Sequence, residues 1–130
     1  MFPLVHYVKG IVKNLLNPRV SSLAIVSANV ELDDTSRIYR LVKAKRASIG
    51  AYTYISANTE IENATIGKFC SIADHCRIGM GAHTLKCLST SPVFTQKING
   101  CQAQWTPVNV GDKSLEENTV HIGNDVWTVS

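Results

Sequence analysis

The sequence predicts an all-β protein, a β-helix of stacked hexapeptide repeats with a short N-terminal helix and a long excursion loop. Branched apolar residues recur six positions apart, a spacing that no helical period produces. Small residues follow these anchors at offsets of one and four positions. A β-helix explains both observations, because each short strand turns one large side chain inward and each bend leaves room for a small one. Three such units close a coil, and coils stack at about 4.8 Å.

Residues 1–17 are predicted to form an amphipathic helix. Apolar residues recur there at intervals of three and four, and Asn17-Pro18 ends the pattern. We expect this helix to dock across one end of the domain, because the open end of a repeat stack needs a cap. Lys9 and Lys13 give it a basic flank, so a membrane surface or a partner is the alternative. The same two lysines interrupt the apolar run and argue against a signal peptide.

Residues 18–130 are predicted to form the repeat domain. A stretch rich in Lys and Arg, residues 39–48, is expected to interrupt the repeat, and the pattern slips by one residue before residue 66. The anchors are Val20, Val26, Leu32, Ile38, Ile49, Ile55, Ile61, Ile66, Ile72 and Ile78. Small inward residues are expected four positions after the later anchors, at Thr53, Thr59, Thr65, Cys70, Cys76 and Ala82. Cys70 and Cys76 are therefore predicted to fill the core rather than to bind a metal or form a disulfide.

The repeat breaks at His83 and resumes at Ile122, so residues 83–119 form a predicted excursion loop. A loop of this length inside a small domain usually carries function. After Val126 another anchor is expected at position 128, but the chain reads Thr128-Val129-Ser130. The domain is therefore expected to end in mid-coil, with an unpaired strand edge.

Composition places the chain among ordinary globular proteins. It has 130 residues, 45% hydrophobic and 18% charged, and a net charge of +3. Basic residues are not interleaved with aromatic ones, so a nucleic-acid partner is not expected. No apolar run is long enough for a membrane span. Four cysteines without metal-type spacing indicate reduced thiols, and we expect a cytoplasmic protein.

Four segments together resemble the hexapeptide-repeat O-acetyltransferases, in particular the xenobiotic acetyltransferase subfamily that includes the CatB-type enzymes. The segments are residues 66–72, the Gly81-Ala82-His83 tripeptide, the Ser-Thr-Ser-Pro-Val-Phe run at 89–94, and residues 122–127. The resemblance covers about residues 48–127. It implies a left-handed parallel β-helix, a homotrimer, active sites between subunits, and acetyl transfer from acetyl-CoA to a hydroxyl of a sugar or xenobiotic.

The resemblance also implies roles for individual residues. His83 stands at the position of the general base, and a histidine suits this role because a neutral hydroxyl is a poor nucleophile. Backbone N–H groups or the hydroxyls of Ser89 and Thr90 would stabilise the oxyanion. The remaining site residues are Pro92, Phe94 and Trp105 on the acceptor side and Asn124 and Trp127 on the acetyl-CoA side; no metal is implied.

Related proteins continue past Trp127 with further coils that supply much of the acetyl-CoA groove. We therefore expect this chain to bind acetyl-CoA weakly or not at all. One alternative is a non-catalytic β-helix for assembly or sugar binding, with His83 an exposed loop histidine. A zinc β-helix of the γ-carbonic-anhydrase kind is the other, using His75, His83 and His121, although these are 8 and 38 residues apart and lack a close pair. The acceptor is not readable from the sequence.

Overall fold

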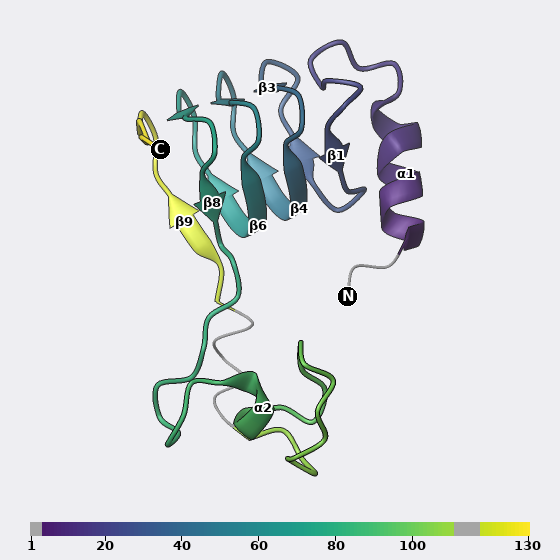
Figure 1. The fold of residues 1–130 in the computed structure, drawn as a ribbon. Coiled ribbons are helices and arrows are strands. Elements are labelled where there is room, and N and C mark those ends of the chain that lie inside the picture. The colour runs from purple at the N-terminus through teal and green to yellow at the C-terminus, as the bar shows by residue number, and fades with distance from the viewer. Residues whose placement is uncertain (1–3, 111–117) are drawn as a thin grey trace. The chain divides into compact units, whose positions relative to one another are not determined.

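The structure is a computed structural model that describes residues 4–110 and 118–130, in two compact units. Of these residues, the coil unit comprises 4–80 and 119–130, and the loop unit comprises 81–110 and 118. Among the described residues, the coil unit contains the helix α1 and nine strands, and the loop unit contains the short helix α2. Both helices and several of the strands are labelled in Figure 1.

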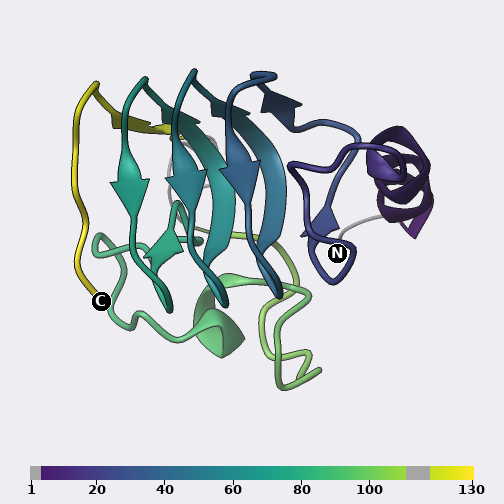
Figure 2. The ribbon, with the colours of Figure 1, turned by 90° about the horizontal axis from the view of Figure 1, so that it is seen from above.

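The coil unit is a left-handed parallel β-helix of about three turns, which confirms the predicted fold class. Every strand pairing is parallel. Figure 2 shows successive coils side by side with their strands in register. The strands are β1 (Ile25–Val26), β2 (Glu31–Leu32), β3 (Arg37–Ile38), β4 (Lys43–Ile49), β5 (Tyr54–Ile55), β6 (Glu60–Ile66), β7 (Ser71–Ile72), β8 (Arg77–Ile78) and β9 (Val120–Ile122).

One coil takes 17 residues where the register is regular, one fewer than three hexapeptides. Ile38 pairs with Ile55 and Ile55 with Ile72, each 17 residues further along the chain. Each such coil therefore contains one five-residue unit, which accounts for the slip between Ile61 and Ile66. Like residues still stack on like residues, because the short unit falls at the same corner of each coil.

The predicted interruption at residues 39–48 is wrong, since β4 runs through most of it. Ala44 is buried and pairs with Ile61 in register, so it occupies an anchor position. An alanine there is too small to be recognised in a pattern of branched residues. The lysines and arginines around it point outward, where Lys45 and Arg46 both pair with Glu62 of β6 at 3.0 and 2.6 Å.

Two of the predicted inward positions are also wrong. Thr65 is exposed and Ala64 is buried in its place, because the five-residue unit brings the inward position one residue forward. Ala82 is exposed in the loop unit. Thr53, Thr59 and Cys70 are buried as predicted, and Cys76 is half-buried against the core.

The inward polar residues are satisfied by a repeated hydrogen bond. The hydroxyls of Ser36 and Thr53 donate to the carbonyls of Gly50 and Gly67, at 2.5 and 2.7 Å. Cys70, in the same column, donates its thiol to the Gly123 carbonyl at 3.0 Å. A buried hydroxyl or thiol with a carbonyl partner avoids the cost of a lost hydrogen bond, so these small residues link successive coils.

The helix α1 (Leu4–Asn14) docks beside the first coil, as predicted, but it ends at Asn14 rather than at residue 17. The contact is made by Gly10, the buried residue of the helix. A Cβ there would overlap the carbonyl oxygen of Val26, so only glycine allows the close approach. Residues 1–3, including Phe2 of the predicted stripe, lie outside the described residues.

Candidate active site

The excursion loop interrupts a single strand of the β-helix. The long strand β6 pairs through its first half with β8 and through its second half with β9. In β6 these halves meet at Asn63, a corner residue with a positive φ of 51°. The chain leaves the coil at the equivalent corner, after Gly79, and Thr119 on the returning side donates its hydroxyl to the Asn63 side chain at 3.2 Å. The loop is thus an insertion at one corner.

The loop unit has structure of its own. It contains the short helix α2 (Pro92–Thr95), with Pro92 at its first position, where a missing N–H costs no hydrogen bond. Asn99 is buried, and its amide nitrogen donates to the carbonyls of Gln96 and Ala103 at 3.3 and 2.7 Å. Its amide oxygen accepts from the N–H of Cys101 at 3.1 Å. The sequence contains no motif that singles out Asn99.

His83 is exposed in the loop unit, and its ring is oriented by the backbone. Its Nδ1 lies 2.9 Å from the carbonyl oxygen of Thr90. A carbonyl oxygen only accepts hydrogen bonds, so this contact requires a proton on Nδ1. In the neutral ring the lone pair is then on Nε2. The contact therefore leaves one ring nitrogen able to accept a hydrogen bond or a proton.

Ser89 and Thr90 are adjacent residues, and the carbonyl oxygen of Thr90 is the atom that orients His83. The Ser89 hydroxyl oxygen accepts the N–H of Ser91 at 3.1 Å, which fixes the turn before α2. Its hydroxyl hydrogen remains available to a further acceptor, since a hydroxyl both accepts and donates. The side chain of Thr90 is exposed, while its carbonyl serves His83.

The three predicted acceptor-side residues belong to α2 and the segment that follows it. Phe94 and Trp105 form an edge-to-face pair, with ring centroids 5.5 Å apart and planes at 69°. Thr106, next to Trp105, donates its hydroxyl to the Val93 carbonyl at 3.1 Å and so holds the pair together. Both rings are more than half exposed, whereas Pro92 is half-buried at the start of α2.

The two residues predicted to contact acetyl-CoA belong to the coil unit. Asn124 accepts the N–H of Lys68 at 2.8 Å through its side-chain oxygen, so part of its role is to join two coils. Trp127 forms an isolated bridge with Ser71 and exposes its indole. The six predicted site residues of the loop unit and these two of the coil unit are thus each held within their own unit.

Thr128 is a residue whose contribution the repeat pattern did not predict. It follows Trp127 in the column of Ile72, and its hydroxyl accepts the N–H of Ala73 at 3.0 Å. The sequence pattern calls for an isoleucine there, which would leave that N–H without this partner. The threonine therefore keeps the column position and adds a hydrogen bond to it.

The other two histidines of the zinc alternative, His75 and His121, are both exposed. His75 is exposed at a corner with a φ of 55°, and its Nδ1 lies 2.9 Å from Asp74. His121 is exposed in β9. Within residues 4–110 and 118–130, no group of three or more His, Cys, Asp or Glu side chains is placed to hold a metal ion. No helix in that part of the chain is long and apolar enough to cross a membrane.

Charged side chains of β4 and β6 form ion pairs with one another on one face of the coil. Burial raises the pKa of Glu62, but hydrogen bonds and charges from Lys45 and Arg46 outweigh it, and the pKa is lowered below its ordinary 4.5. The Lys43-to-Arg46 stretch is therefore not a set of unpaired cations, since Lys43 also pairs with Glu60 at 3.5 Å.

The fold defines the class: this chain is a hexapeptide-repeat β-helix protein with a loop unit inserted at a corner. Comparisons with protein-family models, with curated proteins and with solved structures gave no significant match.

Proposed function

We propose that the protein is an acetyl-CoA-dependent O-acetyltransferase that acts on a hydroxyl of a sugar or xenobiotic, with His83 as general base. The observation that carries this proposal is the 2.9 Å contact between His83 Nδ1 and the Thr90 carbonyl. It selects the ring form in which Nε2 is basic. A backbone carbonyl is the usual means by which a protein orients a catalytic histidine.

The residues divide the chemistry among themselves. Acetyl-CoA, when bound, would supply the acetyl group as a thioester, whose carbon–sulfur bond breaks as the ester forms; CoA then leaves as the thiol, with the proton that His83 has taken from the acceptor hydroxyl. His83 Nε2 takes the proton of the acceptor hydroxyl as its oxygen becomes nucleophilic. The hydroxyls of Ser89 and Thr90 donate hydrogen bonds to the carbonyl oxygen as it gains negative charge. The exposed rings of Phe94 and Trp105, with Pro92, give the acceptor an apolar surface against which to stack.

The side chains assigned to the acetyl-CoA side fit a long, partly apolar substrate. Trp127 presents an indole that is 77% exposed. Asn124 keeps its amide N–H groups as donors, because the contact with Lys68 uses the oxygen. A homotrimer with active sites between subunits belongs to the same proposal. Such a trimer has three times the 14.2 kDa mass of one chain.

The experiment that tests the proposal follows acetyl transfer with acetyl-CoA and a panel of hydroxyl acceptors, namely aminosugars, hexoses and phenolic or macrolide alcohols. Acetylated acceptor is detected by mass spectrometry, because exposed Cys101 would react with thiol reagents used to detect free CoA. Acetyl-CoA is to be supplied at about 5 mM, so that its concentration lies above the ordinary KM range of about 1 µM to 1 mM. At least one acceptor is expected to gain an acetyl group. No product with any acceptor at stoichiometric enzyme would contradict the proposal.

A carbohydrate-binding protein without catalysis is the second candidate, and the exposed Phe94–Trp105 pair favours it. Aromatic faces stack on sugar rings without any need for a base. Saturable sugar binding without product, lost in Trp105→Ala and retained in His83→Ala, would support this candidate over the enzyme.

A further inference from the structure

The helix α1 docks on the coil through the face opposite its apolar stripe, where His6 and Tyr7 are half-buried one turn before Gly10. Gly10 is its buried residue and lies against the Val26 carbonyl. Asn14, one turn later on the same face, is half-buried, and Lys13 reaches the carbonyls of Ala28 and Val30 at 3.4 and 3.1 Å. The helix is thus fixed by glycine and polar groups.

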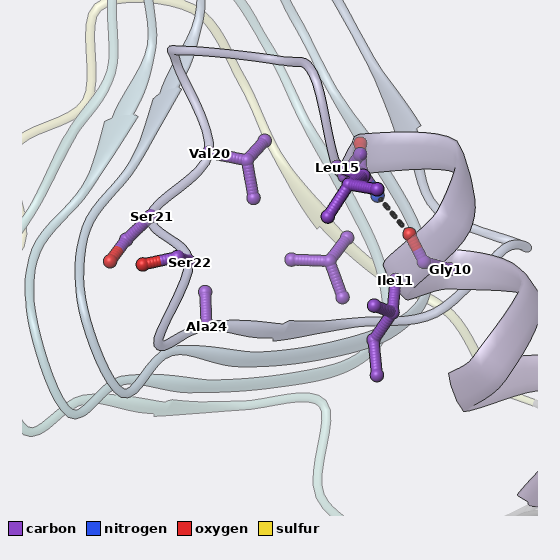
Figure 3. A pocket seen from close by; sticks show the side chains of 9 residues that line it. Gly10, Ile11, Leu15, Val20, Ser21, Ser22 and Ala24 are labelled. Atoms are coloured by element: carbon purple, nitrogen blue, oxygen red, sulfur yellow. Dashed lines mark hydrogen bonds between the residues drawn. The ribbon is translucent and has the colours of Figure 1, made fainter.

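The apolar stripe of the helix points the other way. Val8 and Val12 each lie two positions from Gly10, about 200° around the helix axis. Their exposed fractions are 52% and 68%, and Leu16, just after the helix, is 93% exposed. Only the edge of the stripe meets the coil: Ile11 and Leu15 line a small cleft together with Val20 and Ala24, as Figure 3 shows. The apolar surface made of Leu4, Val5, Val8, Val12 and Leu16 is here called the outer helix face.

The charge around the outer helix face has one sign. Residues 1–30 contain no Asp or Glu, whereas they contain Lys9, Lys13 and Arg19. Lys9 is exposed and lies one turn from both Val5 and Val12, at the border of the face. A long lysine side chain at such a border lies along the apolar surface and presents its charge beside it.

The charge and the shape of the outer helix face indicate which kind of partner can cover it. A second copy would bring two faces of the same positive sign together, with no acidic residue in the first thirty to offset it. A convex helical stripe with a cation, Lys9, at its border instead matches an interface of hydrocarbon overlaid by negative headgroups. We propose that the outer helix face of α1 is a docking surface for an anionic lipid bilayer, on which the protein lies peripherally with α1 parallel to the membrane plane.

The test is sedimentation of the full chain with vesicles of phosphatidylcholine containing about 30% phosphatidylglycerol, compared with phosphatidylcholine alone. Wild type is expected to bind the anionic vesicles, and to bind less as salt is raised, because salt screens the headgroup charge. Val8→Glu with Val12→Glu should lower the partition coefficient by about tenfold or more, since it places charge where hydrocarbon contact is needed. Val8→Gln with Val12→Gln should also lower the partition coefficient. Lys9→Gln should lower it about fivefold.

The matched control is Leu88→Glu with Val108→Glu, which places the same charges on exposed apolar residues of the loop unit. This control should bind vesicles like wild type. Thermal unfolding by circular dichroism should be unchanged in Val8→Gln with Val12→Gln, because both side chains face solvent.

Three results would overturn the proposal. The first is that wild type fails to bind anionic vesicles. The second is that the Val8 and Val12 variants bind them as wild type does. The third is that, without lipid, wild type forms a larger species than these variants, which would show that a second copy covers the face.

Discussion

The His83→Ala variant is expected to lower kcat/KM for acetyl transfer by about 10²- to 10⁴-fold, the range over which general bases contribute. Alanine removes the Nε2 lone pair that takes the acceptor proton. It leaves the Thr90 carbonyl without its ring donor, but that carbonyl is on an exposed residue and water replaces the histidine. The fold should therefore survive. The measurement is the initial rate of acetylated product, with circular dichroism as a check on folding.

A matched control is available at the exposed coil histidine. His75 lies at a φ of 55°, and asparagine tolerates this region better than alanine does. The His75→Asn variant should retain the wild-type rate within about twofold, as expected of a surface substitution. Equal rates for wild type and His83→Ala would show that His83 is not the general base. An equal loss of rate in His75→Asn would show that the effect is not specific to the loop.

The Ile55→Ala variant is expected to lower the free energy of unfolding by about 2–5 kcal/mol. Ile55 is completely buried, and it stacks between Ile38 and Ile72 in neighbouring coils. Truncation opens a cavity between layers whose spacing is fixed by backbone hydrogen bonds, so little collapse can offset it. Against a usual total of about 5–15 kcal/mol, this is a large fraction. Urea denaturation followed by circular dichroism, at one fixed protein concentration, measures it.

The same substitution at Ile25 provides the control. Ile25 is in β1 with a side chain 40% exposed, so Ile25→Ala should cost less than about 1.5 kcal/mol. If Ile55→Ala were no more destabilising than Ile25→Ala, the inward column of isoleucines would not be the main source of stability.

The fold was predictable because its signal is repeated. Large residues such as Ile55 and Ile72 mark each turn of the coil, and many copies agree even where one fails. Ala44 was missed because an anchor column accepts a small residue when its neighbours in adjacent coils are large. The five-residue unit also explains why Thr65 was placed inward when Ala64 is the buried residue.

The orientation of the helix was not predictable from its amphipathic pattern. That pattern shows which face is apolar, and the ordinary inference is that the apolar face packs on the core. At Gly10 the opposite face docks, because the absence of a Cβ allows backbone to meet backbone. The amphipathic pattern alone does not distinguish docking by the apolar face from docking by the Gly10 face, since the helix is the same in both and only its rotation on the coil differs.

The residues of the proposed site come from the sequence, but their geometry was not predictable from it. His83 was identified by its position at the break in the repeat. Its hydrogen bond to Thr90 depends on how the chain turns back before α2, and that turn is fixed by local contacts such as Ser91 to Ser89. The buried Asn99, which ties the loop unit together, carried no signal because asparagine is common in any surface loop.

The most direct test of the account is the protonation of the His83 ring, read from ¹⁵N chemical shifts of histidine-labelled protein at a pH where the ring is neutral. The chain has four histidines, and the signal lost in His83→Ala assigns the ring. A proton on Nδ1 and a bare Nε2 are predicted, because the Thr90 carbonyl holds Nδ1–H. A ring protonated on Nε2 would contradict the account, since the nitrogen assigned as the base would then have no lone pair to offer.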